Sequence, residues 1–169
     1  MAAILPQIPE DHIMFKSLLT AAGLAFSLAV LDLSAGALAA EIADPAAGHR
    51  ALGEAASAAG DHASAIRHLS AAMVAGAEGA DLESLIGRSF QELGNLREAK
   101  RHFERALALA PDHLEARARL GSVFLGQGRI EKAEEQLAAL GRLCPAGCAE
   151  FTDLRAAVAA YRVVMASGA

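Results

Sequence analysis

Apolar residues recur three or four positions apart along most of the chain, which is the spacing of one face of an α-helix. In the clearest part, two such stretches are separated by Gly94-Asn95, because Gly and Asn tolerate the left-handed backbone at which helices end. Pro111 ends the second stretch. We therefore expect two helices joined by a short turn. The apolar positions of the first are Leu82, Leu85, Ile86 and Phe90, and those of the second are Ala99, Phe103, Ala106 and Leu107.

This pair of helices repeats with a period of 34 residues. The repeats are predicted at 46–79, 80–113 and 114–147. A single pair cannot bury its apolar face alone, whereas about three stacked pairs can. We expect Gly87 and Ala99 to lie where two helices cross closely, because a larger side chain would push them apart. The aligned positions include Gly53, Gly87 and Gly121, then Gly60, Gly94 and Gly128, then Ala65, Ala99 and Ala133, then Leu69, Phe103 and Leu137.

A further helix is predicted after the third repeat, from Ala149 to Met165. It would cover the apolar end of the stack, which would otherwise face water. Its apolar positions are Leu154, Val158, Tyr161, Val164 and Met165, and its water-facing positions are Glu150, Asp153, Arg155 and Arg162.

The repeated residues resemble the signature of the tetratricopeptide repeat (TPR). The resemblance implies an all-α fold, a right-handed superhelical α-solenoid of three TPR hairpins over 46–147 with a C-terminal capping helix at 148–166. It also implies an inner groove that holds a peptide or a protein segment. The first copy departs from the signature at Ala56 and Ala77. The other two carry it in Gly87, Phe90, Gly94, Ala99, Phe103, Ala106 and Pro111, and in Gly121, Phe124, Gly128, Ala133, Leu137, Leu140 and Pro145.

Composition agrees with an all-α protein and excludes two other classes. Alanine, the best helix former, is the commonest residue, whereas the chain has one Tyr and no Trp. Charged residues make up 21% and apolar residues 54%, which excludes an intrinsically disordered chain. The net charge is −5, whereas nucleic-acid binding needs surplus positive charge. No nucleic-acid partner is therefore expected.

Residues 1–39 are predicted to be an N-terminal extension followed by a signal peptide. Lys16 precedes the uncharged run Leu18–Leu31, and Ala37-Leu38-Ala39 supplies a small-residue cleavage site, so cleavage is expected near Ala39/Ala40. We expect translation to start at Met14, and the mature protein to be periplasmic. The run is short for a membrane span, which needs roughly 20 residues. An uncleaved membrane anchor and a buried helix are the alternatives.

Two cysteines lie close together, Cys144 and Cys148, between the third repeat and the last helix. In an exported protein such a pair is expected to form a disulfide. Pro145 and Gly147 interrupt the helix and allow the sulfur atoms to converge. A redox-active pair or a metal site is the alternative, but the spacing is not C-x-x-C, and no His lies near enough to complete a zinc site.

The histidines do not suggest a catalytic or metal site. His68 and His102 occupy the same place in successive repeats, and equivalent atoms there lie roughly 10 Å apart. We expect both to point to solvent. No nucleophile–base pair, paired carboxylates or phosphate-binding loop can be recognised. The sequence therefore predicts a protein that is not an enzyme, with no cofactor and no metal.

The predicted function is that of a periplasmic adaptor or scaffold that binds a protein or peptide in its groove. Arginines along the groove could receive an acidic or C-terminal segment, because guanidinium groups bind carboxylates with two hydrogen bonds. Solvated polarity without a ligand is the alternative for these residues. The alternative function is thiol or metal handling through the cysteine pair, or an accessory role in a membrane complex. The groove residues are Arg50, Glu54, Ser84, Arg88, Gln91, Arg119 and Ser122.

Overall fold

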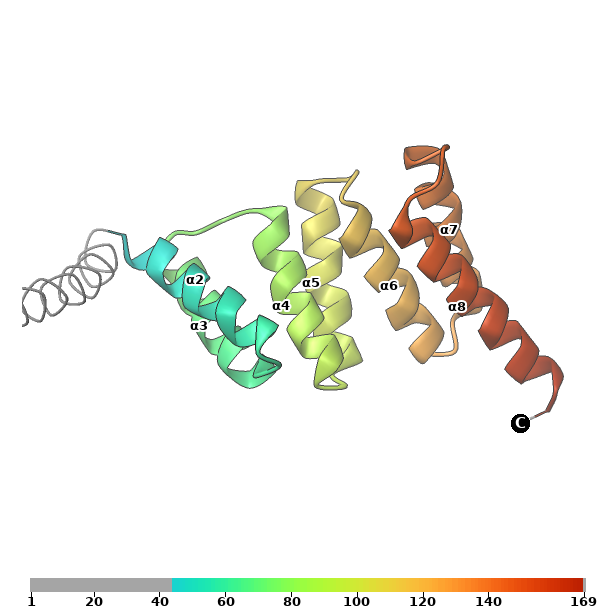
Figure 1. Ribbon diagram of the computed structural model, residues 1–169, viewed down its shortest axis with the longest axis horizontal. Coiled ribbons are helices and arrows are strands. Elements are labelled where there is room, and N and C mark those ends of the chain that lie inside the picture. Colours follow the sequence, from blue (N-terminus) through green and yellow to red (C-terminus); the bar gives the residue numbers. More distant parts are fainter. Residues whose placement is uncertain (1–43, 169) are drawn as a thin grey trace, which may run out of the picture. The chain divides into compact units, whose positions relative to one another are not determined.

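The computed structural model describes residues 44–168, and within them the chain forms seven helices and no strand (Figure 1). Successive helices pair along a row, and this solenoid of three hairpins and a capping helix confirms the all-α fold predicted above. The predicted leader at 1–39 lies outside the described residues. The helices are α2 (Pro45–Ala58), α3 (His62–Val74), α4 (Ala80–Glu92), α5 (Leu96–Leu109), α6 (Leu114–Gly126), α7 (Ile130–Leu143) and α8 (Ala149–Ala166).

The turn inside each hairpin is fixed by a glycine with positive φ and, in the first two, by a capping side chain. Gly94 has a φ of +75°, a conformation that L side chains rarely adopt. Asn95 follows it, and its side chain accepts a hydrogen bond from the backbone N–H of Glu98 at 3.3 Å. Asp61 caps α3 in the same way, and hydrogen bonds from the Ser64 side chain and backbone lower the pKa of Asp61.

A glycine in the first helix of each hairpin allows close packing. A Cβ atom on Gly53 would lie 2.6 Å from Leu69 Cγ, and one on Gly87 would lie 2.8 Å from Phe103 Cε1. Both large side chains are fully buried, so these glycines receive them. The close crossing expected at Gly87 is confirmed. We call positions 53, 87 and 121, and position 155 after one further period, the glycine register.

The third hairpin departs from this pattern. A Cβ on Gly121 would meet Leu154 of α8, with its Cδ2 at 2.6 Å, instead of a side chain from α7. Leu137, which corresponds to Leu69 and Phe103, is only partly buried. Helix α8 therefore packs directly on α6, in a place that the repeat pattern assigns to α7.

Helix α8 buries apolar side chains against the stack up to Val158 but not at its C-terminal end. Leu154 and Val158 are buried, at 1% and 4% exposed, as predicted. Val164 and Met165 are 52% and 59% exposed, so the expectation that they face the core is wrong. The reason is length, because α8 has 18 residues and its last turns extend beyond α6 and α7 (Figure 1).

The last position of the glycine register carries a different residue. Arg155 stands there, one period after Gly121, and it is exposed. Its guanidinium carbon lies 5.4 Å from the centre of the Phe151 ring. A helix could not approach α8 here as closely as α5 approaches α4.

Within residues 44–168, no helix is both long and apolar enough to cross a membrane.

Candidate functional site

The first helices of the hairpins form the inner side of the row. Helix α2 contacts α4, α4 contacts α6, and α6 contacts α8. In the part of the chain described, no such contact joins α3 to α5 or α5 to α7. In a curved row of hairpins, a helix that contacts the equivalent helix of the next hairpin lies on the inside of the curve. A helix without such a contact lies on the outside. The inner side is therefore built by α2, α4, α6 and α8.

Arg88 connects three of these helices. Its Nη2 donates to Ser57 Oγ of α2 at 3.1 Å, and its Nη1 lies 3.8 Å from Glu115 Oε1 of α6. The Arg88 side chain is 31% exposed, so the contacts are made at the edge of solvent. One arginine thus joins successive repeats across the inner side.

Arg119 continues the same set of contacts. Its Nε donates to Glu115 Oε1 at 2.9 Å, and its Nη1 lies 3.6 Å from Glu92 Oε1 of α4. Gln91 Oε1 lies 3.5 Å from the same nitrogen. We call this set the inner-face network, and its members are Ser57, Arg88, Gln91, Glu92, Glu115 and Arg119.

The three groove arginines predicted from the sequence are all on the inner helices, but each lies beside a carboxylate. Arg50 Nε is 2.8 Å from Glu54 Oε1, one helical turn away. Arg88 and Arg119 share Glu115. An incoming acidic group would therefore have to compete with these carboxylates. The four-residue spacing of Arg50–Glu54 and Glu115–Arg119 could have indicated two of the pairs, whereas the contact of Arg88 with Glu115 joins different repeats.

The remaining predicted groove residues divide into surface and core. Gln91 and Ser122 are partly exposed, and Ser122 Oγ donates to the carbonyl of Ala118 at 3.2 Å. Ser84, expected at the surface, is only 2% exposed, because the packing of α4 against its neighbours covers it. Ser84 is therefore a core residue and does not line an open surface.

A pocket of ≈ 330 Å³ lies between α6 and α8 at one end of the inner side. Arg119 and Ser122 line it, as do two carboxylates of α8 that the sequence reasoning did not assign to the groove, Glu150 and Asp153. Their three-residue spacing on a helix could have indicated a shared face. The other lining residues are Glu115, Ala118, Ala149 and Leu154.

Each hairpin also contains a polar pair between its two helices, with partners 19 residues apart. The pairs are His49–His68, Glu83–His102 and Arg117–Gln136, in equivalent positions of the three repeats. In the second, His102 Nδ1 lies 2.6 Å from Glu83 Oε2, and the histidine ring stacks on Phe90 with ring centres 5.4 Å apart. His102 is 7% exposed, so the expectation that it points to solvent is wrong.

The pair of the third hairpin has a different chemistry. Arg117 Nη1 donates to Gln136 Oε1 at 3.1 Å, and its Nη2 donates to the carbonyl of Pro111. Burial, and to a smaller extent the charge of Arg142, lower the pKa of Arg117. The same position of the repeat is therefore filled by an acid–base pair in one hairpin and by a cation–amide pair in another.

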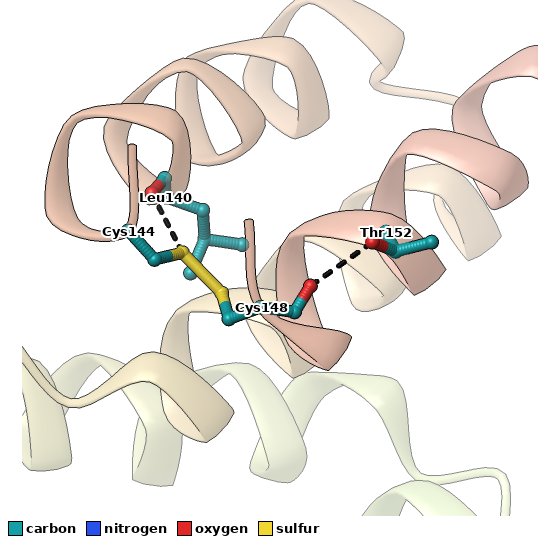
Figure 2. Close-up of a disulfide and its surroundings, with 4 residues drawn as sticks. All are labelled: Leu140, Cys144, Cys148 and Thr152. Atoms are coloured by element: carbon teal, nitrogen blue, oxygen red, sulfur yellow. Dashed lines mark hydrogen bonds between the residues drawn. A yellow bond between two sulfur atoms is a disulfide. The ribbon is translucent and has the colours of Figure 1, made fainter. Parts of the chain in front are cut away.

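A disulfide joins Cys144 to Cys148, with 5.9 Å between their Cα atoms (Figure 2). Cys144 follows the last residue of α7 and Cys148 precedes the first residue of α8. Cys144 Sγ also contacts the carbonyl oxygen of Leu140, and the carbonyl oxygen of Cys148 accepts from Thr152 Oγ1. The disulfide thus closes the turn that sets α8 against α7, and a loop of this length contributes about 2 kcal/mol by chain entropy.

Within residues 44–168, no group of three or more His, Cys, Asp or Glu side chains could hold a metal ion. The inner side offers arginine, carboxylate, amide and hydroxyl groups for hydrogen bonding and ion pairing.

Comparison with known proteins identifies the repeat. Residues 90–158 match the tetratricopeptide repeat family. A comparison with curated proteins gives no match. The sequence match begins near the end of α4 and ends within α8, so it includes α5, the third hairpin and the first part of α8.

Solved structures with the same fold include YrrB, described as a TPR protein with an unusual peptide-binding site. It is 24% identical with a TM-score of 0.63, over 83% of this chain and 74% of YrrB. The first TPR of Spaghetti (RPAP3), bound to the HSP90 peptide SRMEEVD, is 19% identical with a TM-score of 0.62. The match covers 72% of this chain and 93% of that one. The second TPR domain of human RPAP3, in complex with the HSP70 peptide SGPTIEEVD, is 18% identical with a TM-score of 0.61. The match covers 67% of this chain and 93% of that one.

At these identities the likeness shows a common fold. Residues 90–158 therefore match the tetratricopeptide repeat family, and the described part of the chain has the fold of solved TPR structures.

Proposed function

We propose that the protein is an exported adaptor that binds a protein or peptide segment along its inner side. The observation that carries the proposal is the inner-face network, which places arginine, carboxylate and amide groups of successive repeats on one surface. Extended segments offer backbone and side-chain polar groups at regular intervals, and such a row of side chains can bind them. Peptide binding by solved TPR structures of the same fold supports the proposal.

The charges of the inner side suggest how a partner would bind. Glu54, Glu92 and Glu115 accompany the three arginines, and Glu150 and Asp153 add two carboxylates at the α8 end. A partner with acidic groups would replace Glu115 as the ligand of Arg88 and Arg119. Because the acidic groups of the partner would form ion pairs with Arg88 and Arg119, its affinity should fall as salt concentration rises.

The first prediction tests the site. A photo-crosslinking amino acid at Ser122 should form adducts with a partner in cells, because this residue lines the α6–α8 pocket. Replacing Arg50, Arg88 and Arg119 together with Ala should reduce the adduct. It should leave the circular dichroism spectrum nearly unchanged, because these partly exposed side chains lie outside the core and the helices keep their backbone hydrogen bonds. Gel electrophoresis with mass spectrometry measures the adduct.

The matched control carries the crosslinker at Lys132 and the substitutions at Arg67, Arg101 and Lys100, on the outer helices α3, α5 and α7. These side chains bind Ser64, Glu98 and Glu104 of their own helices. Equal crosslinking at Ser122 and Lys132, or an adduct that survives the inner triple substitution, would contradict an inner binding site.

The second prediction tests export. Protein isolated from the periplasmic fraction should begin at Ala40 or Glu41, and peptide mapping without reductant should join Cys144 to Cys148, because disulfides persist in oxidising compartments. A chain that begins at Met1 or Met14 in the cytosol, with free thiols, would contradict this part of the proposal while leaving the binding site untested by that result.

A further inference from the structure

We infer that His49 and His68 form a binding site for a divalent transition-metal ion of the kind that imidazole prefers, such as Zn²⁺. The two side chains come from α2 and α3, and their Nδ1 atoms face each other at 3.4 Å. The ring centres are 5.7 Å apart. Both residues are partly exposed, so an ion can enter and water can complete its coordination.

The distance suits two ligands of one ion. The same 3.4 Å separation also allows an N–H···N hydrogen bond between the two neutral rings, which an ion would replace. Two nitrogen ligands at about 2.0–2.1 Å from a tetrahedral zinc ion are separated by about 3.3–3.4 Å, which follows from the tetrahedral angle. The side chains therefore already stand at the spacing of two ligands on one ion.

Comparison of the three polar pairs supports the same conclusion. Glu83–His102 joins an acid to a base, and Arg117–Gln136 joins a donor to an acceptor. The pair of the first hairpin alone has two groups of the same kind, each with a ring nitrogen that can offer a lone pair. A cation between the rings would satisfy both lone pairs, as the complementary partners do in the other hairpins.

The backbone holds the two rings in place. Gly53, one turn after His49, receives the side chain of Leu69, the residue next to His68. This close approach of α2 and α3 brings the rings together before any ion binds. Two neighbouring cations point elsewhere, because Arg50 pairs with Glu54 and Arg67 Nη2 donates to Ser64 Oγ.

The described residues offer no third ligand at this place, so the site is open. Zn²⁺ would keep water in its remaining positions, as it does wherever the protein supplies fewer than four ligands. The ion would fasten α2 to α3 in the hairpin whose buried residues are mostly small. Its binding would therefore appear as greater thermal stability, because a ligand that binds only the folded state stabilises it.

The experiment is calorimetric titration of the untagged full-length chain with zinc chloride, with melting temperature measured in parallel. We expect saturable binding near one equivalent and a rise in melting temperature of at least about 3 °C, reversed by EDTA. His49→Gln and His68→Gln should each weaken binding by at least about tenfold, since each removes one of two protein ligands. Their circular dichroism spectra show whether they remain folded.

The matched controls are His62→Gln and His113→Gln, which change partly buried histidines of other turns and should leave zinc affinity unchanged. Absence of saturable binding would overturn the inference. So would zinc binding that His49→Gln and His68→Gln leave intact, because the ion would then be held elsewhere, for example by His12 or by the polar groups of other hairpins. Binding that these two variants alone abolish would support it.

Discussion

Replacing Glu83 with Leu should lower the free energy of unfolding by roughly 2–4 kcal/mol, between the cost of a lost buried hydrogen bond and that of a broken buried ion pair. The substitution leaves His102 Nδ1 without its partner in a place where the side chain is 9% exposed. Water cannot replace the lost carboxylate without opening the hairpin. Urea denaturation followed by far-ultraviolet circular dichroism measures the loss.

Two controls separate this pair from ordinary surface polarity. Glu104→Ala breaks an exposed pair with Lys100, 2.9 Å apart, and should cost no more than about 1 kcal/mol. The double variant Glu83→Leu with His102→Leu should be less destabilised than the sum of its single variants, because both buried polar groups are then gone. If Glu83→Leu costs no more than Glu104→Ala, the buried pair does not stabilise the fold.

Replacing Gly87 with Leu should destabilise the array by about 1–3 kcal/mol or more through overpacking. The new Cβ would lie 2.8 Å from Phe103 Cε1, and the Phe103 ring is fully buried, so it has no free space to enter. Thermal unfolding measured by calorimetry should show a lower midpoint. Combining Gly87→Leu with Phe103→Ala should recover part of the loss, since the smaller residue makes room.

The glycine register provides a matched control. Arg155→Leu places the same side chain at the equivalent position of α8, where the side chain is exposed and borders an open pocket between α7 and α8. It should change stability by no more than about 0.5 kcal/mol. Equal effects at positions 87 and 155 would mean that the loss at Gly87 does not come from packing against Phe103, because helix propensity alone favours Leu over Gly at position 87.

The helices and the close crossings could be predicted from the sequence because both depend on local rules. Apolar spacing identifies a helix face, and a small residue at a fixed period identifies a close contact. The packing of Leu154 on Gly121 could not be predicted in the same way. Leu137 has the right type and spacing for that position, and only the three-dimensional competition between α7 and α8 decides which leucine fills it.

The candidate site was predicted less completely than the fold. The inner helices and the arginines on them follow from the period, but the contacts of Arg88 do not, because Ser57 and Glu115 belong to the repeats on either side of it. The burial of Ser84 and His102 was also missed. The sequence does not indicate whether a neighbouring helix covers a polar side chain. The partner of His102 is Glu83, which lies 19 residues earlier in the chain and on another helix.

Arg155 also determines where an array of this kind can be lengthened by design. A new 34-residue unit inserted between α7 and α8 would present its own glycine to Leu154, so the existing α8 could cover it as it now covers α6. A second helix added after α8 would instead meet the Arg155 side chain. Engineered copies should therefore be spliced into the interior of the array, while extension past α8 would first require Arg155→Gly.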